Sequence, residues 1–224
     1  MRRTTEVASK EYFEYLRASF LPEFCIRLGR RWFFRPLARV FRGRVLDIGC
    51  GIGHFLSVYA HALGLDVNPH CARYCREQGF KVIRGDASLL PFLNASFDGV
   101  LLSHILEHLE DPSVTLGEAV RVLKSGGILY IRVPTATGYL IDRTHKTYLT
   151  YPSLRDMLRR LDCSVLKHRY YPIPWKALGE VIVYNELRII ARKSDGRERA
   201  DNVRGEGGVL PVEEPIIVDR ARNK

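Results

Sequence analysis

The chain has 224 residues, 46% of them hydrophobic, which is enough for one α/β domain with a full core. Its apolar runs are broken well before the roughly 20 residues of a membrane-spanning helix, and no apolar signal-peptide region follows the first five residues, so we expect a soluble, cytoplasmic protein. The formal net charge of +10 comes mainly from residues 1–44, where eleven basic side chains stand against four acidic ones.

Two short amphipathic helices are predicted in residues 11–40. Large apolar side chains recur there at four-residue steps on both sides of Pro22. They are Tyr12, Leu16 and Phe20 before the proline, and Phe24, Leu28 and Trp32 after it. Together with the arginines of the same segment, these helices would form a basic N-terminal helical arm, residues 1–43.

Strand-like and helical segments alternate from Arg44 onward. The expected strands are 44–49, 62–67, 80–85, 97–103 and 127–133, and the expected helices are 54–60, 69–78 and 112–124. This order predicts an α/β fold in which helices cover both faces of a parallel sheet.

The rest of the chain is predicted as a polar loop from 134 to 151, a helix over 152–161, and two more strands. Those strands, 164–171 and 186–193, would complete a domain that spans residues 44–193. Residues 194–224 mix glycine, proline and charge with few large apolar groups, so we expect a disordered C-terminal tail.

The segment VLDIGCGIGHFL places Gly49, Gly51 and Gly53 in a turn between the first strand and the next element. A turn without side chains lets backbone N–H groups approach a ligand closely. The spacing is G-x-G-x-G, whereas the dinucleotide-binding fingerprint would need a glycine at His54. The carboxylate of Asp47 would repel a pyrophosphate but can accept hydrogen bonds from an ammonium group. The loop therefore favours a zwitterionic or cationic ligand.

Two more acids follow the next two predicted strands. Asp66 ends the segment GLD, where a carboxylate can accept both hydroxyls of a ribose, and Asp86 lies in RGDASLLPF, where it can accept from an adenine amine. Because parallel strands end at one edge of the sheet, the three acids should lie close together. The three acids could thus accept hydrogen bonds from the amino-acid, ribose and adenine parts of one ligand.

Five segments resemble, in order, the motifs of class I S-adenosylmethionine-dependent methyltransferases. They are VLDIGCGIGHFL, GLDVNP, GDASLLPF, FDGVLLSHILEHLEDP and RVLKSGGILYIRVP. DRTHKTYLTYPSLRDMLRRL also resembles a segment of the small single-domain group that includes methyltransferase-11-type and ubiquinone-biosynthesis-type enzymes. The resemblance implies a Rossmann-like, doubly wound, seven-stranded and mostly parallel sheet with an antiparallel last strand. It also implies S-adenosyl-L-methionine as cofactor.

The resemblance assigns cofactor-binding roles to specific residues. The methionine portion would be held by Asp47, Gly49, Cys50, Gly51 and Gly53; the ribose by Asp66; and the adenine by Val67, Asp86 and Ala87. The backbone near Leu102 and Ser103 would meet the amino group of the cofactor.

His104 and His108 lie one helical turn apart after the fourth strand, with Glu107 between them. No third ligand has a suitable local spacing, and the resembled family generally works without a metal, so we predict none. We interpret His108 as structural and His104 as a residue of the acceptor site. His145, with Tyr148 nearby, is the other candidate acid or base; the alternative is that His145 packs its loop against the sheet.

The expected function is methyl transfer to a small-molecule or lipid-like acceptor. The alternatives are a non-catalytic S-adenosylmethionine-binding module and a methyltransferase that acts on RNA or a nucleotide-linked substrate; the glycine spacing disfavours a nicotinamide-dependent oxidoreductase. We expect the basic arm to cover the cofactor cleft. Two other interpretations are open, namely that Trp32, Phe33 and Phe34 enter an anionic membrane surface, or that the arginines bind the phosphates of a nucleic acid.

Overall fold

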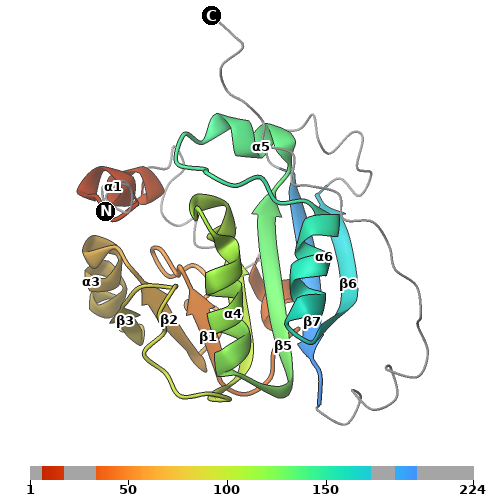
Figure 1. The fold of residues 1–224 in the computed structure, drawn as a ribbon. Helices are drawn as coiled ribbons and strands as arrows, with labels where there is room; N and C mark the ends of the chain where they lie inside the picture. The colour runs from red at the N-terminus through yellow and green to blue at the C-terminus, as the bar shows by residue number, and fades with distance from the viewer. Residues whose placement is uncertain (1–6, 18–33, 173–184, 196–224) are drawn as a thin grey trace, which may run out of the picture.

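The computed structural model describes residues 7–17, 34–172 and 185–195, which form a seven-stranded sheet with helices on both faces (Figure 1). The strands are β1 (Val45–Ile48), β2 (Ala62–Asp66), β3 (Val82–Arg84), β4 (Phe97–Ser103), β5 (Leu123–Pro134), β6 (Cys163–Tyr171) and β7 (Glu186–Lys193). Their order is β3-β2-β1-β4-β5-β7-β6. Strands β1 to β5 pair in parallel, and β7 lies antiparallel between β5 and β6. The predicted fold class is confirmed.

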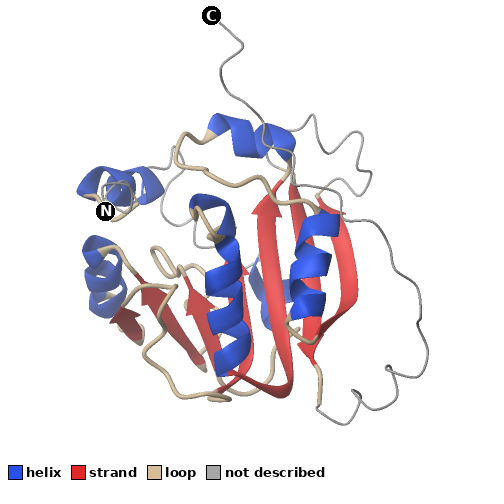
Figure 2. Cartoon of the chain, viewed as in Figure 1, coloured by secondary structure: helices blue, strands red, loops and turns tan. Residues whose placement is uncertain are grey.

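Each face of the sheet packs against its own hydrophobic core. Alternate residues of β4 point to opposite faces, as the two-residue period of a strand requires. Val100 and Leu102 join the core formed with α4 (Pro112–Val122) and α6 (Tyr151–Arg160). Leu101 joins the core formed with α3 (Pro69–Glu77). Figure 2 shows α4 and α6 together on one face.

Side-chain caps explain where the main helices begin. Asn68 accepts hydrogen bonds from two backbone N–H groups at the start of α3, and Asp111 accepts one at the start of α4. Thr150 and Ser153 form a reciprocal capping box on α6. In each helix a proline occupies one of the first two positions, where its missing N–H costs no hydrogen bond.

Three short elements lie beyond the C-terminal ends of the parallel strands. They are α1 (Lys10–Arg17), the 3-10 helix η1 (Leu106–His108) and α5 (Ala136–Ile141). Figure 1 shows α1 and α5 above this edge of the sheet. Helix α1 confirms the first predicted arm helix. Most of the second, with Trp32 and Phe33, lies outside the described residues, as does nearly all of the predicted tail.

The structure differs from the predicted elements in three places. Residues 51–58 form successive turns instead of the predicted helix over 54–60, because backbone bonds to the third and the fourth preceding residue alternate there. The loop predicted for 134–151 contains α5, which is too short to show a helical period. Strand β5 begins at Leu123, inside the helix predicted for 112–124, because Leu123 pairs with Phe97 of β4.

Candidate active site

A cleft of about 1250 Å³ opens at the C-terminal edge of the sheet. Asp47, Asp66, Ser103 and Arg132 line it from the ends of β1, β2, β4 and β5. Open α/β sheets bind ligands at this edge because the loops and the last side chains of the parallel strands converge there.

The first described segment of the N-terminal arm, residues 7–17, forms one wall of the cleft. The side-chain amide of Asn68 donates to the carbonyl oxygens of Val7 and Ser9, both at 2.9 Å. Phe13 is buried beside Ile52 and Cys71. Helix α1 is thereby attached to the element that follows β2.

The glycines of the loop share a positive φ, but Gly51 and Gly53 have different surroundings. Gly49, Gly51 and Gly53 all have positive φ, of +72°, +52° and +79°. A Cβ at Gly51 would meet only Leu16 of the arm, at 3.6 Å, whereas a Cβ at Gly53 would lie 2.8 Å from the Phe80 ring. Gly51 therefore keeps space open toward the cleft, and Gly53 allows close packing inside the domain.

Asp66 is buried and accepts two backbone hydrogen bonds, one from Gly51 N–H at 2.7 Å and one from Asn68 N–H at 2.8 Å. Burial raises the pKa of the carboxyl group, and these two bonds oppose the rise. A carboxylate can accept about four hydrogen bonds. Each oxygen thus keeps capacity for one more donor, which suits a pair of hydroxyl groups.

Asp47 is 3% exposed and lines the cleft. Burial and the neighbouring charge of Asp66 raise its pKa to about 7, while Arg132 opposes that shift. A buried carboxyl group with this pKa would be ionised more readily beside a cation.

The remaining predicted cofactor residues fall into two groups. Val67, Ala87, Cys50 and Ser103 line the cleft, as does Asp86. The Asp86 carboxylate also accepts from the N–H and the hydroxyl of Ser88, both at 2.8 Å, which makes it a turn residue as well.

Leu102, Gly53 and Tyr148 are not among the described residues that line the cleft. The Leu102 side chain belongs to a core. Tyr148 contacts the Tyr139 ring at a centroid distance of 5.3 Å. Their assigned roles in binding or catalysis stay predictions.

His104 is held between two carboxylates. Its Nδ1 lies 3.0 Å from Glu107 Oε1 and its Nε2 lies 2.7 Å from Glu186 Oε2. Burial opposes the charged ring, but these two hydrogen bonds prevail and raise the pKa of His104 to about 9. The residue has φ of +55°, so the chain turns sharply as it leaves β4. The side chain is 38% exposed and lines the cleft.

Glu186 and two arginines complete a buried charge network that sequence reasoning missed. Arg132 Nη2 donates to Glu186 at 2.8 Å, and Arg188 Nε donates to the same carboxylate. Burial alone would raise the pKa of Glu186, but hydrogen bonds from His104 and Arg132 hold it well below its usual range. The available signal was a charged residue inside each of the apolar strands GILYIRV and ELRIIARK.

His108 and His145 meet at the cleft although 36 residues separate them in the chain. Their ring centroids lie 4.8 Å apart. The His145 ring stacks on Tyr139, and its Nδ1 lies 3.0 Å from the Tyr139 carbonyl oxygen. Burial lowers the pKa of His108. The predicted pairing of His104 with His108 therefore missed the histidine that lies against His108.

Comparisons with known proteins agree with the fold. Residues 46–131 match the family model described as a methyltransferase domain. The crystal structure of a SAM-dependent methyltransferase from Archaeoglobus fulgidus has a TM-score of 0.65 and 25% sequence identity, over 82% of this chain and 98% of that one.

Two curated relatives carry more specific names. The chain is 39% identical over 99 residues to the phthiotriol/phenolphthiotriol dimycocerosates methyltransferase of Mycobacterium leprae, covering 38% of this chain and 36% of that protein. It is 37% identical over 97 residues to the fatty-acid O-methyltransferase of Mycolicibacterium smegmatis, covering 38% and 34%. The matched segments span about half or less of the curated relatives' own length. Among the described residues, no helix has the length and apolarity to cross a membrane.

Proposed function

The chain belongs to the class I S-adenosylmethionine-dependent methyltransferases of the type 11 group, and from this premise we propose that it methylates a small-molecule or lipid-like acceptor in the cleft described above. The observation that carries the proposal is the size of the cleft. Single-ligand pockets usually measure about 300–1000 Å³. A cleft of about 1250 Å³ has room for an acceptor beside the cofactor.

The residues at the ends of β1 and β2 fit S-adenosylmethionine. Gly51 leaves space for close backbone approach, Asp66 keeps acceptor capacity for the ribose hydroxyls, and Asp47 offers a buried carboxyl group to the ammonium group. Asp86 and Ala87 would bound the adenine. When bound, the cofactor supplies a methyl group on a sulfonium.

The protein's own contribution would be alignment and exclusion of water. Holding two reactants in one cleft replaces a bimolecular encounter with a reaction between positioned groups, which lowers the activation free energy by several kcal/mol. His104 has both ring nitrogens within hydrogen-bond distance of carboxylates, so we assign it to orienting the acceptor side of the cleft. A general-base role for His104 or His145 stays a prediction.

Apolar side chains at the mouth of the cleft favour a lipid-like acceptor. Tyr15, Ile141 and Val114 line the cleft and are 64%, 59% and 47% exposed. Exposed apolar groups around a cleft are typical of sites that bind apolar ligands. The similarity to a fatty-acid O-methyltransferase supports the same acceptor class.

Two measurements test the proposal. In a thermal-shift comparison, S-adenosylmethionine and S-adenosylhomocysteine should stabilise the protein and NAD should not; a ligand at 100 times its dissociation constant adds about 2.7 kcal/mol. The protein is then incubated with methyl-labelled cofactor and a whole-cell extract, from which lipids and nucleic acids are recovered separately. Label in the organic phase supports a lipid-like acceptor, and label only in nucleic acid would contradict it.

A further inference from the structure

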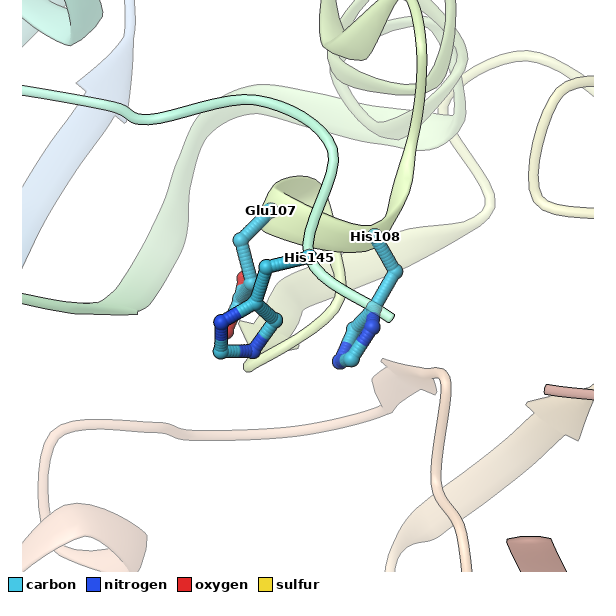
Figure 3. Close-up of side chains that lie close together, drawn as sticks. All are labelled: Glu107, His108 and His145. Carbon is cyan, nitrogen blue, oxygen red and sulfur yellow. The ribbon is translucent and has the colours of Figure 1, made fainter. Parts of the chain in front are cut away.

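Glu107, His108 and His145 form a compact cluster on the acceptor side of the cleft (Figure 3). Glu107 and His108 come from η1, and His145 comes from the loop after α5. One ligand atom from each residue lies within 4.8 Å of the other two. The figure shows the two rings side by side, with the Glu107 carboxyl group next to His145.

Backbone hydrogen bonds fix the two segments against each other. The Glu107 carbonyl oxygen accepts from Lys146 N–H at 2.7 Å and from Thr147 N–H at 3.1 Å. The Thr147 hydroxyl donates to the Leu109 carbonyl at 2.7 Å. These hydrogen bonds hold η1 and the loop that carries His145 in a fixed position relative to each other.

The surrounding acceptors set the tautomer of each neutral ring. The Tyr139 carbonyl can only accept, so His145 donates through Nδ1. The Thr144 hydroxyl donates to Asp142 at 2.6 Å, so at its 2.9 Å contact with Nδ1 of His108 the histidine is the donor. In both neutral rings the lone pair then lies on Nε2, as in metal-binding histidines whose other nitrogen donates to an oxygen.

Glu107 supplies an independent observation that points to a ligand. It is 1% exposed, and its Oε1 lies 3.0 Å from His104 Nδ1. Its Oε2 is buried and has no hydrogen-bond partner within the described part of the chain. A buried polar atom left unsatisfied costs about 1–3 kcal/mol, and more when it is charged. A cation at this position would remove that cost.

We propose that Glu107, His108 and His145 bind a divalent first-row transition-metal ion that faces the cleft. Two imidazoles and one carboxylate are a common ligand set for such ions. Bonds of about 2.1 Å at tetrahedral angles separate ligand atoms by about 3.4 Å, so atoms that lie within 4.8 Å of one another would move closer together when the ion binds. His104, Thr144 and the Tyr139 carbonyl would orient the ligands from outside.

An ion with three protein ligands keeps at least one position for water or an acceptor oxygen. If the proposed methyltransferase function holds, on which this step rests, the acceptor would carry an oxygen that can coordinate the ion. The position of the two histidines supports an ion that the acceptor can reach, because both of them line the cleft.

The test uses the full chain without an affinity tag, stripped with a chelator and dialysed. Cobalt(II) is titrated and followed by visible absorption, and zinc(II) is titrated by calorimetry, both without cofactor or acceptor. We expect one ion per chain, and zinc binding at least tenfold weaker in His145→Gln and in Glu107→Gln. The control His168→Gln, which removes an exposed histidine on β6, should bind like the wild type.

Circular dichroism and a thermal melt show whether each variant is folded, and cofactor calorimetry is run on the wild type. Should the variants fail to fold, imidazole nitrogen shifts in the wild type decide, because zinc should move the signals of His108 and His145 and not those of His168. Absence of stoichiometric binding by the wild type, or equal binding by the folded variants, would overturn the metal site. Metal binding without cofactor binding would instead count against the proposed function.

Discussion

The two halves of the cleft differ in how their acidic side chains are paired with basic ones. At the ends of β1 and β2, two buried acids lie near each other, and Arg132 alone offsets the rise in the pKa of Asp47. At the ends of β4 and β5 and the start of β7, Glu186 accepts from two arginines and a histidine, and one oxygen of Glu107 accepts from that same histidine.

Over the ranges that the structure describes, the acids at β1 and β2 thus lack a directly bonded basic partner. Glu186 is neutralised within the protein, and Glu107 keeps one buried oxygen for the proposed metal ion. A buried acid without a basic partner is costly until a positively charged ligand binds, so it contributes to binding. A paired acid contributes to the folded state and to the shape of the pocket. Mutations in the proposed cofactor half, at β1 and β2, should therefore change mainly the affinity for the cofactor. Mutations in the proposed acceptor half, at β4, β5 and β7, should change mainly the free energy of unfolding.

The largest contrast is expected between Glu186→Gln and Asp47→Asn. The first leaves buried Arg132 and Arg188 without their charged partner and should lower the free energy of unfolding by about 3–5 kcal/mol. The second, at pH 8, removes a buried charge beside Asp66 and should leave the free energy of unfolding unchanged or raise it. Urea unfolding of both variants measures this. Equal losses would show that the two halves do not differ.

Asp66→Ala should weaken S-adenosylmethionine binding at least a hundredfold, because two hydrogen bonds to a charged group contribute about 1.5–3 kcal/mol each. Isothermal calorimetry measures the affinity. The control Asp156→Ala removes an exposed acid on α6 and should bind normally. An unchanged affinity in Asp66→Ala would refute the ribose assignment.

A second pair of variants compares two glycines of the same loop. Gly51→Ala should weaken cofactor binding more than tenfold with a loss of stability of about 1–2 kcal/mol from its positive φ. Gly53→Ala has the same backbone penalty and adds a collision with Phe80, so its melting temperature should fall further. Thermal melts and calorimetry on both variants separate the two roles. The reverse ranking in stability would mean that the loop packs differently.

The same division explains what could be predicted from the sequence. The sheet and the cofactor half follow from local patterns, because apolar runs mark the strands and Asp47 and Asp66 each stand at or near the end of one. The acceptor half depends on pairs distant in the chain, such as Arg132 with Glu186, 54 residues apart. No local spacing identifies such pairs, and for the same reason the contact of His145 with His108 was missed.

Local patterns also fail where one residue type serves two purposes. All three loop glycines have positive φ, but only the atoms around each one show that Gly51 faces the cleft and Gly53 faces Phe80. Those atoms come from α1 and from the segment after α3, which the motif does not include.

The smallest expected effect is a pH dependence confined to the cofactor half. The pKa of Asp47 is raised to about 7, so the carboxyl group takes up a proton as the pH falls through 7. Its protonated form cannot pair with an ammonium group, and the ionised fraction at pH 6 is about a tenth of that at pH 8. Cofactor affinity should therefore be about tenfold weaker at pH 6 than at pH 8. Asp47→Asn should bind more weakly at pH 8 and lose most of this dependence. If the variant kept the full pH dependence, another group would be responsible, and the cofactor half would not owe its selectivity for a cation to Asp47.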